Sequence, residues 1–207
     1  GKLLSNRTAN ILYEGAPLSP RQRCFWKVRV WDKDGKASVW SEAAAWEMGL
    51  LTPADWRAHW IARTTDIHER TAPRFRREFR IDGRIKRARV YLCGLGCHVL
   101  SINGRKVGDH LLDPGYTRYD RRALYVTHDV TELLQKGLNV VGVELGNGWL
   151  NVQYRNAWNF DWAPWRAAPK LLLTLYVELG DGKVRLIGTD ANWNCASGPT
   201  TFNVIYG

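Results

Sequence analysis

The stretch Arg74-Phe-Arg-Arg-Glu-Phe-Arg-Ile-Asp-Gly83 determines the fold class that we expect for this 207-residue chain. Three apolar side chains share one parity, and three charged side chains share the other: Phe75, Phe79 and Ile81 against Arg76, Glu78 and Arg80. Successive side chains of a β-strand point to opposite faces, so this alternation predicts a strand with one buried and one solvated face. The Asp-Gly pair at its end is typical of a hairpin turn.

The same region is strongly basic. Eight of the sixteen residues from 74 to 89 are Lys or Arg, and the formal net charge of the chain is +10. Such a charge suits acidic partners in general: nucleic acid, an anionic membrane surface, an acidic polysaccharide or an acidic neighbouring domain. Because the aromatic residues gather elsewhere instead of interleaving with the basic ones, we expect no nucleic-acid partner. No apolar run approaches the ~20 residues of a membrane-spanning helix, so we expect no membrane partner.

Period-two alternation continues through most of the chain and predicts an all-β fold. The expected strands are 25–31, 44–48, 74–81, 88–92, 98–102, 123–127, 140–145, 171–179 and 184–188. Asp-Gly or Asn-Gly pairs at 34–35, 82–83, 103–104 and 181–182 predict tight turns, and Pro114-Gly115 predicts a type II turn. Residues 130–135 are expected to form at most a short helical turn, capped by Thr131.

The chain is expected to contain two modules. A proline and turn-forming residues interrupt the alternation between Gly49 and Trp60, which places a boundary there. Residues 1–52 hold too few strands for a complete sandwich, so we expect Gly1 to lie within a truncated β module. Residues 53–207 hold enough strands for a complete jelly-roll-like β-sandwich.

The segment from Gly146 to Trp165 is unusually aromatic for a loop and also rich in amides. A sugar ring offers an apolar face that lies on an indole and hydroxyls that bond to Asn, Asp and Gln, so the segment is a candidate carbohydrate site. Its proposed contacts are Trp149, Trp158, Asp161, Trp162 and Trp165. The alternative, with equal weight, is that these aromatic side chains support a long loop folded over the sandwich.

Other patterns are weaker. The four cysteines have no paired spacing and are expected to be free thiols, with Cys93 and Cys97 on one face of a strand. A metal site at Cys93, Cys97 and His98 is set aside because structural zinc needs four ligands. The other histidines are scattered and are interpreted, with His98, as surface or loop residues. Gly94-Leu-Gly96 begins like a dinucleotide fingerprint, but a strand follows in place of a helix, so a turn or bulge is favoured.

Several stretches together resemble the N-terminal region of bacterial α-L-rhamnosidases, the family 78 glycoside hydrolases. They include Trp56-Arg-Ala-His-Trp-Ile61, Asp113-Pro-Gly-Tyr-Thr-Arg-Tyr-Asp120 and Leu145-Gly-Asn-Gly-Trp149, with further matches at 25–32, 40–42, 46–51, 94–96, 102–104, 129–131 and 198–199. The resemblance implies the end of a fibronectin-type-III-like module followed by a jelly-roll sandwich. It also implies a catalytic (α/α)₆ barrel beyond Gly207, with carboxylates that hydrolyse the terminal rhamnosyl bond with inversion. We therefore assign no catalytic residue in this chain and expect the chain alone to be inactive.

The resemblance further implies a role for the sandwich in supporting or binding a rhamnose-containing glycan. Some such domains hold the sugar through calcium, for which Asn159 and Asp161 are the candidate ligands, with Asn147 and Asn151 nearby. No other cofactor is expected. Two alternatives stay open: a stand-alone calcium-assisted carbohydrate-binding module, or a scaffold for the barrel. The compartment is not indicated and could be the cytoplasm, the periplasm or the exterior of a bacterium.

Overall fold

The computed structural model describes residues 5, 7, 9–10 and 12–203. The chain divides into two compact units, Gly1–Asp55 and Trp56–Gly207, and the predicted boundary at 52–53 lies three residues from this division. Within the described residues, no helix is long and apolar enough to cross a membrane.

Among its described residues, the first unit contains one antiparallel pair of strands, β1 (Arg23–Trp26) and β2 (Ala44–Glu47), and it ends in the 3₁₀ turn η1 (Pro53–Asp55). Asp32 organises the turn predicted at Asp34-Gly35, because its Oδ1 accepts hydrogen bonds from the backbone N–H groups of Asp34 and Lys36. The strand predicted at 25–31 is shorter than expected and begins two residues earlier, because β1 covers only Arg23–Trp26.

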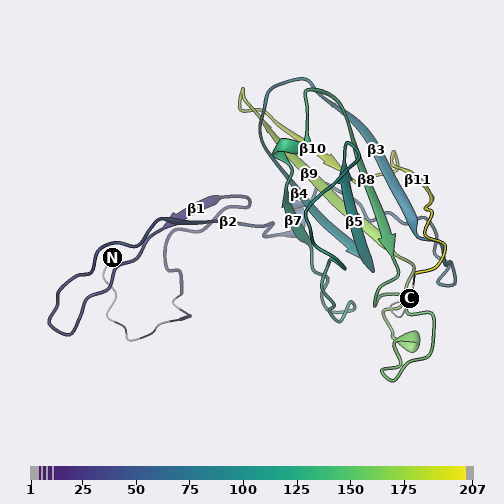
Figure 1. The fold of residues 1–207 in the computed structure, drawn as a ribbon, viewed down its shortest axis with the longest axis horizontal. Coiled ribbons are helices and arrows are strands. Elements are labelled where there is room, and N and C mark those ends of the chain that lie inside the picture. The colour runs from purple at the N-terminus through teal and green to yellow at the C-terminus, as the bar shows by residue number, and fades with distance from the viewer. Residues whose placement is uncertain (1–4, 6, 8, 11, 204–207) are drawn as a thin grey trace. The chain divides into compact units, whose positions relative to one another are not determined.

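The second unit is a sandwich of two antiparallel sheets (Figure 1). The four-stranded sheet has the order β10-β9-β4-β7, with β10 Val184–Gly188, β9 Lys170–Leu179, β4 Ile85–Leu95 and β7 Val126–Asp129. The five-stranded sheet has the order β11-β3-β8-β5-β6, with β11 Asn194–Ser197, β3 Pro73–Ile81, β8 Gly137–Gly146, β5 Cys97–Ile102 and β6 Arg105–Lys106. Consecutive strands β4 and β5 belong to different sheets, so the glycine-rich turn between them carries the chain across the sandwich.

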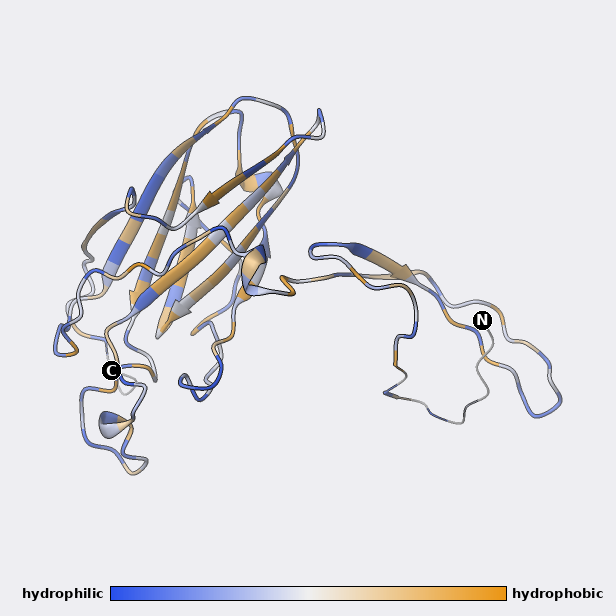
Figure 2. Ribbon diagram, turned by 180° about the vertical axis from the view of Figure 1, so that it is seen from behind, coloured by the Kyte–Doolittle hydropathy of each residue, from blue (hydrophilic) through white to orange (hydrophobic). Residues whose placement is uncertain are grey.

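The core lies between the two sheets and is built from alternating positions of their strands. Its fully buried members include Ile81 from β3, Val141 from β8 and the run Leu171, Leu173 and Leu175 from β9. On β3 the alternate positions, Arg76 and Arg80 among them, are exposed, which confirms the strand with one solvated face. Figure 2 shows the same division as apolar and polar bands along the strands. The all-β prediction is confirmed.

Several local predictions were wrong. Ala123–Thr127 was expected as a strand, but β7 occupies Val126–Asp129, and β6 and β11 were not expected at all. The helical turn is present as η2 (Thr131–Leu133), but Thr131 does not cap it: its Oγ1 accepts from the N–H of Ala88 on β4 instead. The Asp113–Pro114 bond is cis and Gly115 does not have a positive φ, so no type II turn forms there.

Candidate functional site

The aromatic segment forms a long loop, residues 147–169, that projects from one end of the sandwich between β8 and β9 (Figure 1). Phe160, on the short turn η3 (Phe160–Trp162), is the centre of its packing. The Phe160 ring lies 5.4–6.3 Å, between centroids, from four other rings: Tyr116, Trp149, Trp158 and Trp165. Edge-to-face and offset aromatic pairs of this kind stabilise a loop beyond the area they bury. Trp149 and Trp165 therefore pack against Phe160 within the loop, in agreement with the interpretation that the aromatic side chains support it.

Two of the predicted sugar contacts are presented to solvent. Trp162 is 83% exposed and Trp158 is 59% exposed, whereas Asp161 between them is half-buried. Oδ1 of Asp161 is buried without a hydrogen-bond partner. Asn159 is exposed and has φ 53°, a left-handed conformation that asparagine adopts more readily than most residues. Flat indoles at the loop surface thus accompany a carboxylate oxygen that lacks a partner.

The amides of the loop have a different role from the one expected. Asn151 is 1% exposed; its Nδ2 donates to the carbonyl of Ile67 and to Oδ1 of Asn147, both at 2.9 Å, and Nε of Arg166 donates to its Oδ1 at 3.0 Å. Nε2 of Gln153 donates to the carbonyls of Ile67 and Glu69 at 2.9 and 2.8 Å. Because these groups are already satisfied, they hold the loop against the segment before β3 and are not available to a ligand.

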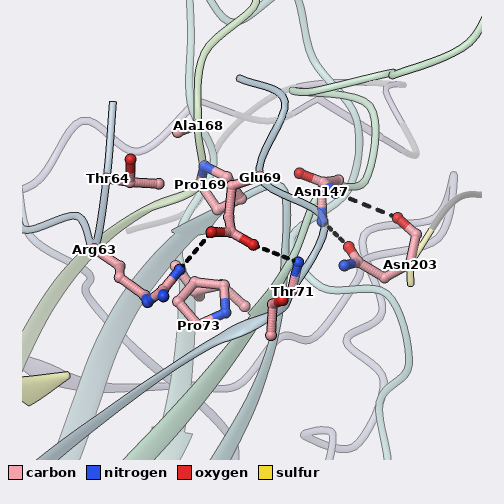
Figure 3. Close-up of a pocket in the computed structure, with 10 residues that line it drawn as sticks. Arg63, Thr64, Glu69, Thr71, Pro73, Asn147, Ala168, Pro169 and Asn203 are labelled. Atoms are coloured by element: carbon pink, nitrogen blue, oxygen red, sulfur yellow. Dashed lines mark hydrogen bonds and ion pairs between the residues drawn. The ribbon is translucent and has the colours of Figure 1, made fainter. Parts of the chain in front are cut away.

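A small pocket lies beside this attachment (Figure 3). Glu69 accepts from the backbone N–H of Thr71 at 2.9 Å and from Nη1 of Arg63 at 2.8 Å, and these bonds lower the pKa of Glu69 to about 2. Across the pocket, the N–H of Asn147 donates to Oδ1 of Asn203 at 2.6 Å. The lining polar groups satisfy one another, so the pocket is a structural joint between the loop and the 63–73 segment.

A second group of polar side chains was missed by sequence reasoning. One ligand-competent atom from each of His98, Asp113 and His128 lies within 4.8 Å of the others. His98 is only 6% exposed, and the interpretation of His98 as a surface or loop residue was wrong. Burial lowers the pKa of His98 to about 4 and also lowers the pKa of His128, with Asp113 acting in the opposite direction on both. The sequence did contain an indication that His98 is buried, because His98 shares its parity along the strand with the core residues Leu100 and Ile102.

The cysteines are free, as predicted. Cys93 and Cys97 do not share a face of one strand, because Cys93 lies on β4 and Cys97 begins β5 beyond the turn. Burial raises the pKa of Cys93 to about 12 and also raises that of Cys97. Both thiols are therefore protonated at neutral pH, which suits packing and not nucleophilic chemistry.

Comparison with known proteins identifies the family. A family model described as the α-L-rhamnosidase N-terminal domain matches residues 83–207, which is more than half of the chain. The chain belongs to this family. A second model, described as the Rha78A-like N-terminal immunoglobulin domain, matches residues 1–52 of this α-L-rhamnosidase N-terminal region. The family predicted from the sequence is confirmed, while the fibronectin-type-III-like and jelly-roll assignments stay predictions.

Individual relatives agree. An α-L-rhamnosidase of Formosa agariphila is 35% identical over 100% of the chain, which covers 24% of that relative. The structure of an α-L-rhamnosidase from Dictyoglumus thermophilum matches 95% of the chain at 38% identity with a TM-score of 0.80, and one from Aspergillus terreus matches 89% at 35% identity with a TM-score of 0.80. The chain covers 23% and 22% of these two structures. The α-L-rhamnosidase N-terminal region thus spans about a quarter of the length of the relatives it matches.

Proposed function

We propose that this chain is the non-catalytic N-terminal region of an α-L-rhamnosidase that removes terminal α-L-rhamnosyl residues with inversion, and that the loop of residues 147–169 contacts the rhamnose-containing glycan. The observation that carries the binding role is the 83% exposure of Trp162 on a loop held by buried hydrogen bonds. An indole exposed on a fixed loop offers a flat apolar surface for a sugar ring without an ordering cost at binding.

The five predicted contacts divide by position. Trp162 and Trp158 lie at the surface and stack against the sugar, and Asp161 between them accepts hydrogen bonds from its hydroxyl groups. Trp149 and Trp165 contact Phe160 and set the position of the exposed indoles. Packing and binding are therefore two roles within one loop.

Calcium is a proposed addition to this site. Oδ1 of Asp161 is buried without a hydrogen-bond partner, and Asn159, two residues earlier in the loop, is exposed, so these two residues would supply oxygen ligands to the ion. When bound, calcium supplies a positive centre for sugar hydroxyl groups. Asn147 and Asn151 do not contribute, because their side chains bond to Asn203, to each other and to Arg166.

Calorimetry tests the binding role. Titration of the chain with methyl α-L-rhamnoside should release heat, and Trp162→Ala should abolish it while leaving the fold intact. Trp46→Ala, which removes a partly exposed indole from the first unit, is the matched control and should bind normally. Repeating the titration in the presence of calcium, with the wild-type chain and with Asp161→Asn, tests whether calcium contributes to glycan binding. Absence of heat, or equal heat for Trp162→Ala, would refute glycan binding by this loop.

The catalytic part is tested separately. We propose that the acid and base lie on a barrel in cis, outside this chain. The full-length parent should hydrolyse an aryl α-L-rhamnoside, with the product anomer assigned by NMR, and the 207-residue chain should not. Hydrolysis by the chain alone, or none by the parent, would overturn this assignment.

A purely structural role is the second candidate, favoured by the exposed arginines on the outer face of β3. In this case Arg76 and Arg80 meet an acidic surface of the barrel. Reversing both charges should then weaken the parent enzyme's thermal stability. Unchanged stability and activity would exclude this contact.

A further inference from the structure

The cluster of His98, Asp113 and His128 lies where the two sheets meet. His98 is on β5 of the five-stranded sheet, and His128 is on β7 of the four-stranded sheet. Asp113 belongs to the loop between β6 and β7 and is held next to His98, because its carbonyl accepts from the N–H of His98 at 2.8 Å. Three separate segments therefore direct one nitrogen or oxygen each into a common space.

His98 gives an independent indication of a ligand. It is 94% buried, since only 6% of its surface is exposed, and neither Nδ1 nor Nε2 has a hydrogen-bond partner of good geometry. The backbone of Gly94 provides only a weak interaction, which raises the pKa of His98 against the effect of burial. A buried polar group without a partner costs free energy, so native structures almost always supply one. Its neighbour Asp113 does not fill this need: Oδ2 of Asp113 accepts from Nδ1 of His110 at 2.8 Å instead.

We propose that His98, Asp113 and His128 bind a divalent first-row transition-metal ion of the zinc class. Imidazole nitrogens with one carboxylate are the donors that Zn²⁺ accepts, whereas Ca²⁺ and Mg²⁺ prefer oxygen alone. A tetrahedral zinc site with Zn–N bonds of 2.0–2.1 Å has ligand atoms about 3.3 Å apart. The observed atoms, within 4.8 Å of one another, reach that spacing by small rotations of the side chains.

The surroundings are consistent with this site. His110 orients the Asp113 carboxylate through its hydrogen bond to Oδ2, and carboxylates that bind metals are usually held by such hydrogen bonds. The fourth position would be taken by water, or by His110 in place of its bond to Asp113, since the His110 and His128 rings lie 5.8 Å apart. A cavity lined by His98, Leu111 and Leu112 borders the cluster on the His98 side. The ammonium of Lys106 donates to the His110 carbonyl at 3.2 Å.

The bound ion would join the two sheets. Because its ligands come from β5 and β7, unfolding of either strand separates them, and binding must stabilise the folded sandwich. This role is independent of the glycan-binding loop, whose residues are not ligands.

Metal binding is measured on the whole chain after dialysis against EDTA. Addition of Zn²⁺ to about 100-fold above its dissociation constant should raise the melting temperature by about 5–10 °C, and EDTA should reverse the rise. Co²⁺ should give the intense visible absorption of a tetrahedral site, which reports the ligands directly. His128→Gln and Asp113→Asn should each lose both signals. His68→Gln, which changes an exposed histidine outside the cluster, should keep them.

Two results would overturn the proposal. One is an unchanged melting temperature with Zn²⁺ together with no visible absorption with Co²⁺. The other is full retention of the Co²⁺ spectrum in both His128→Gln and Asp113→Asn, which would place the ion elsewhere. If either variant does not fold, the other variant and the wild-type spectrum still decide.

Discussion

Asn151→Ala tests whether buried amides hold the aromatic loop. The substitution removes two neutral hydrogen bonds, to Ile67 and Asn147, and one from the Arg166 guanidinium. A neutral bond contributes about 1 kcal/mol and a bond to a charged group about 1.5 kcal/mol or more. The loss is therefore about 3.5 kcal/mol. One of these bonds ties the loop to Ile67 and the other two join residues within the loop, so most of the loss should appear as local opening of the loop.

Tryptic cleavage after Arg155, which is exposed within the loop, measures that opening. When opening is fast relative to cleavage, a loss of about 3.5 kcal/mol makes cleavage about 300-fold faster. Cleavage after Lys183, in the turn between β9 and β10, is an internal control that should not change. Asn192→Ala, at an exposed turn, should leave both rates alone. If Asn151→Ala changes cleavage after Arg155 by less than about twofold, the hydrogen bonds do not hold the loop.

Two further predictions concern the frame around the loop. Gly96→Ala should lower the free energy of unfolding in urea by about 3 kcal/mol or more, because Gly96 has φ 78° and a Cβ would lie 1.9 Å from the Gly146 carbonyl oxygen. Gly104→Ala is the control: Gly104 has φ 79° but open space around it, so the cost should be only about 1 kcal/mol. Glu69 has a folded-state pKa of about 2, below its unfolded value, so its contribution to stability is present above about pH 4.5 and lost as the pH falls through 2. The difference in urea midpoint between wild type and Glu69→Gln should therefore shrink as the pH falls through that window, and a constant difference would contradict the assignment.

The strands with strong alternation could be predicted, and the edge strands β6 and β11 could not. The pattern of β3 is visible because its apolar residues face a core and its arginines face water. β11, Asn194–Ser197, is exposed at all four positions and pairs with β3 through its backbone, so its side chains carry no period. Thr131 looked like a helix cap because Ser and Thr often are, but the approach of β4 provides it with another partner.

In the candidate binding loop, the sequence alone also failed to separate residues that have different roles. Asn151 and Trp162 lie in one segment, and from its composition alone both residues would be candidate sugar contacts. The structure separates them, because one hydrogen-bond partner of the Asn151 side chain is the carbonyl of Ile67, 84 residues away, whereas the Trp162 side chain is left exposed. The amides do not weaken the case for a binding surface, however. An exposed indole on a mobile loop would lose affinity to ordering, so buried hydrogen bonds that fix the loop make Trp162 a better contact. Asn151→Ala should consequently weaken glycan binding without removing any group that touches the glycan, whereas Trp162→Ala should abolish binding without loosening the loop.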